Sequence, residues 1–94
     1  MRDYELTLIV RPEVDEVNLA ALEGKVKDLI AEKGGQVTQV EHWGRRRMAY
    51  PIKKIEEGQY VFMLAQLPAQ SPHELERQFR LNEQILRYLL VRKE

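Results

Sequence analysis

Cysteine is absent from this sequence of 94 residues, and aliphatic hydroxyl side chains are few. The absence of cysteine excludes disulfide bonds and thiolate metal sites. The sequence has one serine, Ser71, at the start of a predicted helix, and two threonines, Thr7 and Thr38, inside predicted strands. Because a catalytic hydroxyl needs a base beside it, these residues form no catalytic triad. We therefore expect a protein that is not an enzyme.

Long hydrophobic runs, phosphate-binding loops and metal-ligand clusters are also missing. No apolar stretch approaches the roughly 20 residues that span a bilayer. The Gly34-Gly35 pair is not followed by the Lys-Ser/Thr of a phosphate-binding loop. His42 and His73 are far apart and have no partners at metal-ligand spacing. We expect no cofactor, no metal, no small-molecule substrate and no membrane attachment, and a soluble protein in the cytoplasm.

The chain also lacks a net charge, because its formal total at pH 7 is zero. The charges are nevertheless unevenly distributed: acidic residues exceed basic ones by four over residues 1–41 and by one over residues 55–94. Residues 42–54, here called the basic segment, carry five cations, two aromatic side chains and no carboxylate. Attraction to a polyanion therefore has to come from a local patch and not from the total charge.

Hydrophobic periodicity predicts the first half of the fold. Apolar side chains alternate from Tyr4 to Val10, which predicts a strand that ends before Pro12. A three- and four-residue spacing then predicts a helix, with Asp15 as its N-cap and Gly34-Gly35 as its end. A second strand is predicted over residues 36–47.

The second half repeats this order after a turn-rich connection, which Pro51 and Gly58 are expected to bracket. Residues 59–67 are apolar on both faces and predict a central strand. Ser71 and Glu74 have the spacing of a capping box, with the serine hydroxyl as N-cap of a second helix. Residues 85–91 predict a final strand.

The predicted order is strand, helix, strand, strand, helix, strand. Right-handed crossovers then favour an α+β fold, the ferredoxin-like βαββαβ sandwich. Its sheet has four antiparallel strands, the first and third strands are central, and both helices cover one face. We expect residues 1–94 to form a single domain.

The basic segment has two interpretations. Charges on an edge strand prevent edge-to-edge pairing, and Glu41, Arg46 and Arg47 would do so without binding anything. Three adjacent arginines, however, exceed what edge protection requires, and arginine grips phosphate with two hydrogen bonds. Trp43 and Tyr50 flank the arginines and offer surfaces for stacking. This second interpretation predicts an interface with RNA or with a protein.

Aromatic residues also alternate in the predicted third strand, at Tyr60 and Phe62. RNA-recognition motifs of the same fold stack bases on such residues, although Glu57 stands before Gly58 where that motif usually opens with a basic residue. Together with Ile9 and Leu64, these aromatics would form an apolar patch on the uncovered sheet face, and such patches mark partners.

Four sequence segments resemble the bacterial small-subunit ribosomal protein S-six family. They are residues 1–5 (MRDYE), 43–52 (WGRRRMAYPI), 58–60 (GQY) and 81–88 (LNEQILRY). The resemblance covers essentially the whole chain. It implies a structural role in the small ribosomal subunit, where members of the family pair with ribosomal protein S-eighteen and bind the central domain of small-subunit (16S) ribosomal RNA during assembly.

The resemblance also implies roles for individual residues. The residues expected to contact the partner protein are Glu41, His42, Trp43, Arg46, Arg47, Met48, Tyr50, Tyr60 and Phe62. The cations expected to reach RNA are Arg2, Arg45, Lys53, Lys54, Arg80, Arg87 and Arg92. One departure is His42, which stands where the family has an acidic residue.

Two alternatives remain open from the residues alone. A stand-alone RNA-recognition module would bind single-stranded RNA without a partner. A small-ligand regulatory domain of the same fold would bind a metabolite between subunits. Binding of RNA with and without the partner protein distinguishes these alternatives from the ribosomal role.

Overall fold

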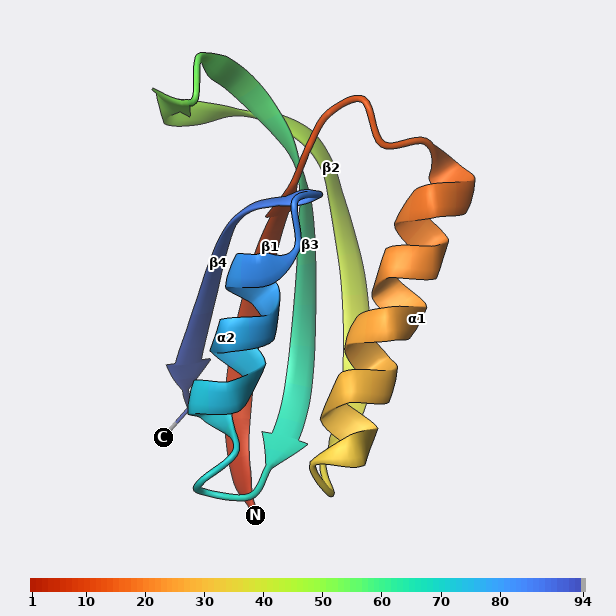
Figure 1. Ribbon diagram of the computed structural model, residues 1–94, viewed down its shortest axis with the longest axis vertical. Helices are drawn as coiled ribbons and strands as arrows, with labels where there is room; N and C mark the ends of the chain where they lie inside the picture. The colour runs from red at the N-terminus through yellow and green to blue at the C-terminus, as the bar shows by residue number, and fades with distance from the viewer. Residues whose placement is uncertain (94) are drawn as a thin grey trace.

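Alternating apolar side chains build the sheet around its first strand. The computed structural model describes residues 1–93, which form six elements (Figure 1). Along β1, the side chains of Tyr4, Leu6, Leu8 and Val10 are buried on one face, as the period of two predicts. The elements are β1 (Arg2–Val10), α1 (Glu16–Glu32), β2 (Gln36–Ile52), β3 (Ile55–Leu67), α2 (Pro72–Leu81) and β4 (Ile85–Arg92).

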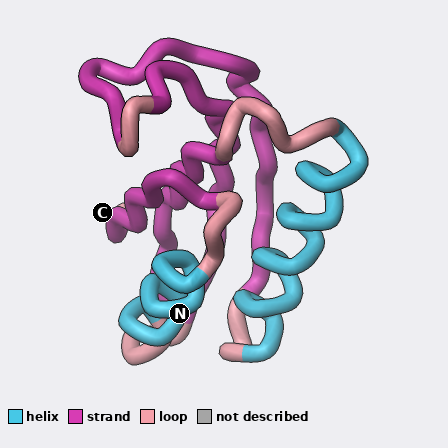
Figure 2. Tube along the Cα trace, turned by 45° about the horizontal axis from the view of Figure 1, so that its top comes forward, coloured by secondary structure: helices cyan, strands magenta, loops and turns pink. Residues whose placement is uncertain are grey.

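The strand order is β2-β3-β1-β4, and every neighbouring pair is antiparallel. Figures 1 and 2 show α1 and α2 on the same side of the sheet. The core lies between them and that face: Val26 and Ile30 of α1 and Leu75 and Phe79 of α2 join one cluster with the buried side chains of β1 and β3. The predicted ferredoxin-like α+β fold is confirmed, with the first and third strands central.

The ends of α1 follow the predicted signals. The Asp15 carboxylate accepts a hydrogen bond from the Asn18 amide at 2.8 Å and caps the N-terminus. At the other end Gly34 has φ +85°, a conformation that glycine adopts without the penalty of a side chain. Gly35 then donates to the Ile30 carbonyl at 3.0 Å, which turns the chain into β2.

The predicted connection between the second and third strands is wrong. β2 continues past Arg47 to Ile52, which pairs with Ile55, so only Lys53 and Lys54 form the turn. Pro51 is tolerated inside this strand because β2 lies at the sheet edge. The far ends of β2 and β3 consequently project past the other strands as a two-stranded arm (Figure 1).

The predicted capping box at α2 is also wrong. Ser71 has helical angles (φ −75°, ψ −30°), and its side chain makes no capping hydrogen bond. Glu74 does not reach back to the cap, because it pairs with Lys33 at the end of α1 at 2.7 Å. This ion pair therefore joins the C-terminus of one helix to the N-terminus of the other.

The Lys33–Glu74 pair predicts a small, pH-dependent contribution to stability. The hydrogen bond from Lys33, followed by its charge, lowers the pKa of Glu74 from the ordinary value of 4.5. A lowered folded-state pKa stabilises the fold above the unfolded pKa, and this stabilisation is lost as the pH falls through the folded pKa. We expect Glu74→Gln to lower the urea midpoint at about pH 7, and the difference from wild type to close as the pH falls through the folded-state pKa of Glu74.

Added salt should reduce the difference in urea midpoint between wild type and Glu74→Gln, because the Lys33–Glu74 pair is partly exposed to solvent. Glu13→Gln, which changes an exposed loop carboxylate, is the matched control. A difference between wild type and Glu74→Gln that persists unchanged at acid pH would assign the effect to helix propensity and not to the ion pair.

Candidate functional site

The sheet face opposite the helices carries a stacked aromatic pair. The register places Glu41 opposite Phe62 and Gly44 opposite Tyr60. The rings of Trp43 and Phe62 stack with centroids 5.2 Å apart and an interplanar angle of 9°. Trp43 remains 40% exposed, which is unusual for the largest apolar side chain. This face therefore offers an aromatic surface to a partner.

Charged side chains hold Trp43 from both sides along β2. Its indole Nε1 donates to the Glu41 carboxylate at 3.3 Å. The guanidinium of Arg46 lies over the indole, 5.5 Å from the ring centroid, and its Nε donates to the Trp43 carbonyl at 3.3 Å. A cation over an indole face contributes about 0.5–1 kcal/mol at an exposed site. Glu41, Trp43 and Arg46 thus form one ordered unit on the edge strand.

Other residues of the basic segment face different directions. His42 pairs with Glu23 of α1, and Arg45 donates to the Pro12 carbonyl at 2.9 Å. Arg47 lies 3.8 Å from Glu56 in a pair that is exposed on both sides. The register of β2 shifts between His42 and Gly44, so Trp43 and Arg46 share one face of the strand. His42 and Arg47 lie on the other face, and the predicted partner residues therefore do not share one surface.

His42 has a local explanation in this chain. Its Nε2 contacts Glu23 Oε1, and that oxygen is buried. A buried carboxylate oxygen without a polar contact is costly, and His42 Nε2 is the polar group that lies against it from β2, although the pair lacks the geometry of a hydrogen bond. His42 is thus part of a contact between β2 and α1.

Two further predicted residues lie where the arm meets the open face. Met48 is buried, whereas Tyr50 is 66% exposed. Both line a hollow of about 120 Å³ together with Ile9, Tyr60 and Arg87. Ile9, Tyr60, Phe62 and Leu64 do lie on the uncovered face, although only the last three are partly exposed.

The predicted RNA-binding cations gather at two ends of the sheet. Arg2 begins β1, and Arg92 is paired with Tyr4, so both lie at the start of that strand. Arg87 is paired with Ile9, at the other end of β1. At about 3.3 Å per residue, the two ends are roughly 25 Å apart. The cations of the second group are Arg45, Lys53, Lys54, Arg80 and Arg87.

A further cation lies beside the second group and was not predicted from the sequence. Arg11 follows β1 directly, and its Nε donates to the Glu83 carbonyl at 2.8 Å. It lines a cavity of about 320 Å³ together with Lys53 and Arg80. In the sequence, Arg11 marks only the end of a strand before Pro12, and nothing in the local pattern indicates which distant cations lie beside it.

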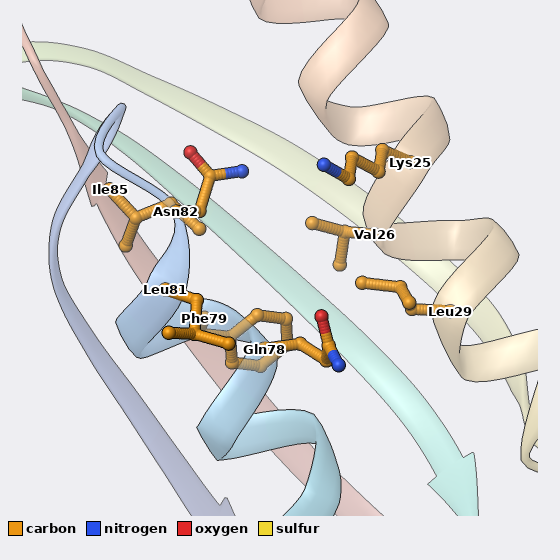
Figure 3. A pocket seen from close by; sticks show the side chains of 8 residues that line it. All are labelled: Lys25, Val26, Leu29, Gln78, Phe79, Leu81, Asn82 and Ile85. Atoms are coloured by element: carbon orange, nitrogen blue, oxygen red, sulfur yellow. The ribbon is translucent and has the colours of Figure 1, made fainter.

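A smaller hollow separates the two helices. Figure 3 shows Val26 and Leu29 of α1 facing Phe79 and Leu81 of α2 across it. Its volume is about 70 Å³, well below the roughly 300–1,000 Å³ of typical ligand pockets. Residues 1–93 contain no cluster of metal-ligating side chains, and no helix among them is long and apolar enough to cross a membrane.

Comparison with known proteins decides the family. The family model for ribosomal protein S6 matches residues 3–92. The chain belongs to the ribosomal protein S6 family. It is 42% identical to small ribosomal subunit protein bS6 of Desulforamulus reducens, over 99% of this chain and 98% of the relative. It is 40% identical to the bS6 protein of Caldanaerobacter subterraneus, over 98% and 97%.

A solved structure agrees with this membership. The crystal structure of 30S ribosomal protein S6 from Thermotoga maritima superposes with a TM-score of 0.90 at 35% identity, and the match covers 98% of this chain and 87% of that one. The predicted family is therefore confirmed, and it is a family of ribosomal proteins and not of enzymes. The predicted location, the ribosome in the bacterial cytoplasm, follows from the membership.

Proposed function

We propose that the protein is a structural constituent of the small ribosomal subunit, without catalytic activity, that binds small-subunit ribosomal RNA together with ribosomal protein S-eighteen during assembly. Its family membership supports this role. The structural observation that carries the proposal is the exposed Trp43–Phe62 stack, which Glu41 and Arg46 hold at the edge of the sheet. We also propose that the chain acts as one domain.

The protein partner would bind the aromatic edge. Exposed tryptophan, tyrosine and arginine are the residues that dominate binding energy at protein interfaces. Trp43 and Arg46 already contact each other, so little conformational entropy remains to be lost when a partner covers them. Glu41 adds a negative charge beside them, which favours a partner with a basic side chain at this point.

RNA would bind the cations at the two ends of β1. Because the net charge is zero and the basic segment offers at most about five phosphate contacts, the affinity of the isolated protein for RNA should be low. It should fall with salt at a log–log slope no steeper than about −0.9 per contact. A partner that adds cations would raise it. The test is to mix the purified protein with the central-domain fragment of the ribosomal RNA, with and without S-eighteen.

We expect binding to depend on the partner. Tight binding of the protein alone, especially to single-stranded RNA, would support the stand-alone module instead. Failure to bind the RNA fragment even with S-eighteen would contradict the proposal.

Replacing both Arg46 and Arg47 by valine tests the edge strand. The exposed side chains point to opposite faces, so the double variant removes charge from both faces of the edge and raises strand propensity. We expect it to stay folded, with a loss of about 0.5–1 kcal/mol from the cation–π contact. We expect it to self-associate at high concentration and to bind S-eighteen more weakly, as measured by sedimentation and by titration.

Gln36→Val is the matched control, because Gln36 is exposed on the same strand and its side-chain amide bonds to Gln66 and not to the unit around Trp43. Its replacement raises strand propensity without removing a charge. This control should remain monomeric and bind S-eighteen normally. A double arginine variant that behaves like the control would show that neither edge protection nor recognition resides in Arg46 and Arg47.

A further inference from the structure

We propose that Arg11, Lys53 and Arg80 form a binding site for one backbone phosphate of the RNA strand. The site is the cavity of about 320 Å³ at the point where β1 ends, β2 turns into β3 and α2 ends. This inference rests on the proposed function, because it assigns a contact point for the RNA that the protein is proposed to bind. It adds Arg11 to the residues that the family resemblance suggested.

The three cations converge on the cavity from segments that are far apart in the sequence. Only one carboxylate, that of Glu83, is among the residues that line it. The lining therefore carries an excess of two positive charges, although the protein as a whole is neutral. Such local excess attracts an anion because the cations repel one another when the cavity holds only water.

Hydrogen bonds hold two of the three cations in place. Arg11 uses Nε to donate to the Glu83 carbonyl, and within residues 1–93 its terminal nitrogens donate to no protein acceptor. Arg80 donates from one terminal nitrogen to the Tyr88 hydroxyl at 2.8 Å, and that hydroxyl lies 3.3 Å from Glu76. Both guanidinium groups thus keep donors for a phosphate while their side chains are already oriented.

The cavity is large enough for a phosphate group. Its volume of about 320 Å³ is many times the roughly 10–15 Å³ that a cavity needs to hold one water molecule. It is polar and open to solvent on one side, as a site for a phosphate that remains part of a chain requires.

The backbone of the turn supplies independent support. Lys53 and Lys54 have φ of 51° and 67°, in the left-handed region that residues other than glycine, asparagine and aspartate rarely adopt. A two-residue hairpin turn with two positive φ angles strongly favours Asn-Gly. The chain instead places two lysines in this strained position, and strain of this kind collects at binding sites. The cations therefore serve a purpose other than folding.

The test measures RNA affinity with S-eighteen present, over a series of salt concentrations. Arg11→Gln and Arg80→Gln should each weaken binding by roughly tenfold or more, as expected for a lost charged hydrogen bond. Each should also reduce the log–log salt slope by about 0.7–0.9. The double variant should lose less than the sum of the two single losses, because both residues contact the same phosphate. Arg77→Gln, on the same helix but outside the cavity, is the control and should bind like wild type.

A second variant separates binding from folding. Lys53→Asn combined with Lys54→Gly gives the turn its preferred residues, so we expect a higher melting temperature together with weaker RNA binding. If the variant binds RNA as tightly as wild type, the turn does not contact the RNA and the proposal is wrong.

The remaining outcomes are distinguishable. If wild type does not bind the RNA fragment with S-eighteen present, the proposed function fails. If wild type binds the RNA fragment, and both Arg11→Gln and Arg80→Gln retain its affinity and salt slope, only the phosphate-binding site is overturned. The melting temperature is also compared in inorganic phosphate and in chloride at equal ionic strength. If free phosphate stabilises wild type, the variants abolish this effect and RNA affinity is unchanged, the cavity binds a small anion and the RNA contact is overturned.

Discussion

Replacing Phe79 with alanine is expected to lower the free energy of unfolding by about 3–5 kcal/mol. Phe79 is only 2% exposed and is one of the two buried residues of α2, the other being Leu75. Its ring also packs against that of Tyr88, with centroids 5.7 Å apart. A hollow already lies beside it between the helices (Figure 3), so the truncation enlarges an existing void and the surroundings cannot close it.

Because whole domains are stable by only about 5–15 kcal/mol, this single change removes a large part of the total. Urea denaturation of the purified variant measures the loss. Phe79→Leu is the matched control and should lose much less, since it keeps most of the apolar volume. A loss below about 1 kcal/mol for the alanine variant would contradict the packing described here.

The fold could be predicted largely from side-chain periodicity. The buried positions of β1, from Tyr4 to Val10, are the alternate apolar residues of the sequence, because one face of that strand packs under the helices. The end of α1 at Gly34 was likewise predictable, because the positive φ there favours glycine.

The two errors in the fold have one physical origin. Pro51 and Gly58 indicated a turn-rich connection, but an edge strand tolerates a proline and Gly58 lies inside β3, so the turn is confined to Lys53 and Lys54. At α2, Glu74 had the spacing of a capping box but found a closer partner in Lys33 of the other helix. In both places tertiary structure overrode a local signal.

The candidate site could be predicted only as a list of residues. Alternation along β2 suggested that neighbours face opposite ways, yet the pairing of His42 with Glu23 needed the position of α1. The convergence of Arg11 with Lys53 and Arg80 needed the whole topology, since these residues are tens of positions apart. The spacing of residues in a single sequence does not show which distant residues lie together in the fold.

Gly58 marks a close approach of two strands, and its replacement by alanine is expected to destabilise the protein by about 1–3 kcal/mol. A Cβ at this position would lie 2.4 Å from Ile9 Cγ2 and 3.3 Å from the Val10 carbonyl oxygen. Ile9 is β-branched and nearly buried, so its side chain cannot rotate away freely. β1 and β3 therefore have to separate locally.

The effect should reach the candidate partner surface, because Gly58 is paired with Arg46 across β2 and β3. We expect Gly58→Ala to weaken binding to S-eighteen as well as stability. Gly24→Ala is the matched control: nothing lies within 4 Å of its added Cβ. Within a helix this substitution should instead stabilise by about 0.5–1 kcal/mol.

A double-mutant cycle with Ile9→Ala identifies the cause. Removing Cγ2 of Ile9 eliminates the shortest contact of the new methyl group, so the combined variant should lose less stability than the sum of the two single variants. For residues in direct contact, the expected difference is about 0.5–3 kcal/mol, measured by urea denaturation. Strict additivity would show that the Ile9 side chain is not the obstacle, and would assign the cost of Gly58→Ala to the contact with the Val10 carbonyl and hence to the backbone of β1.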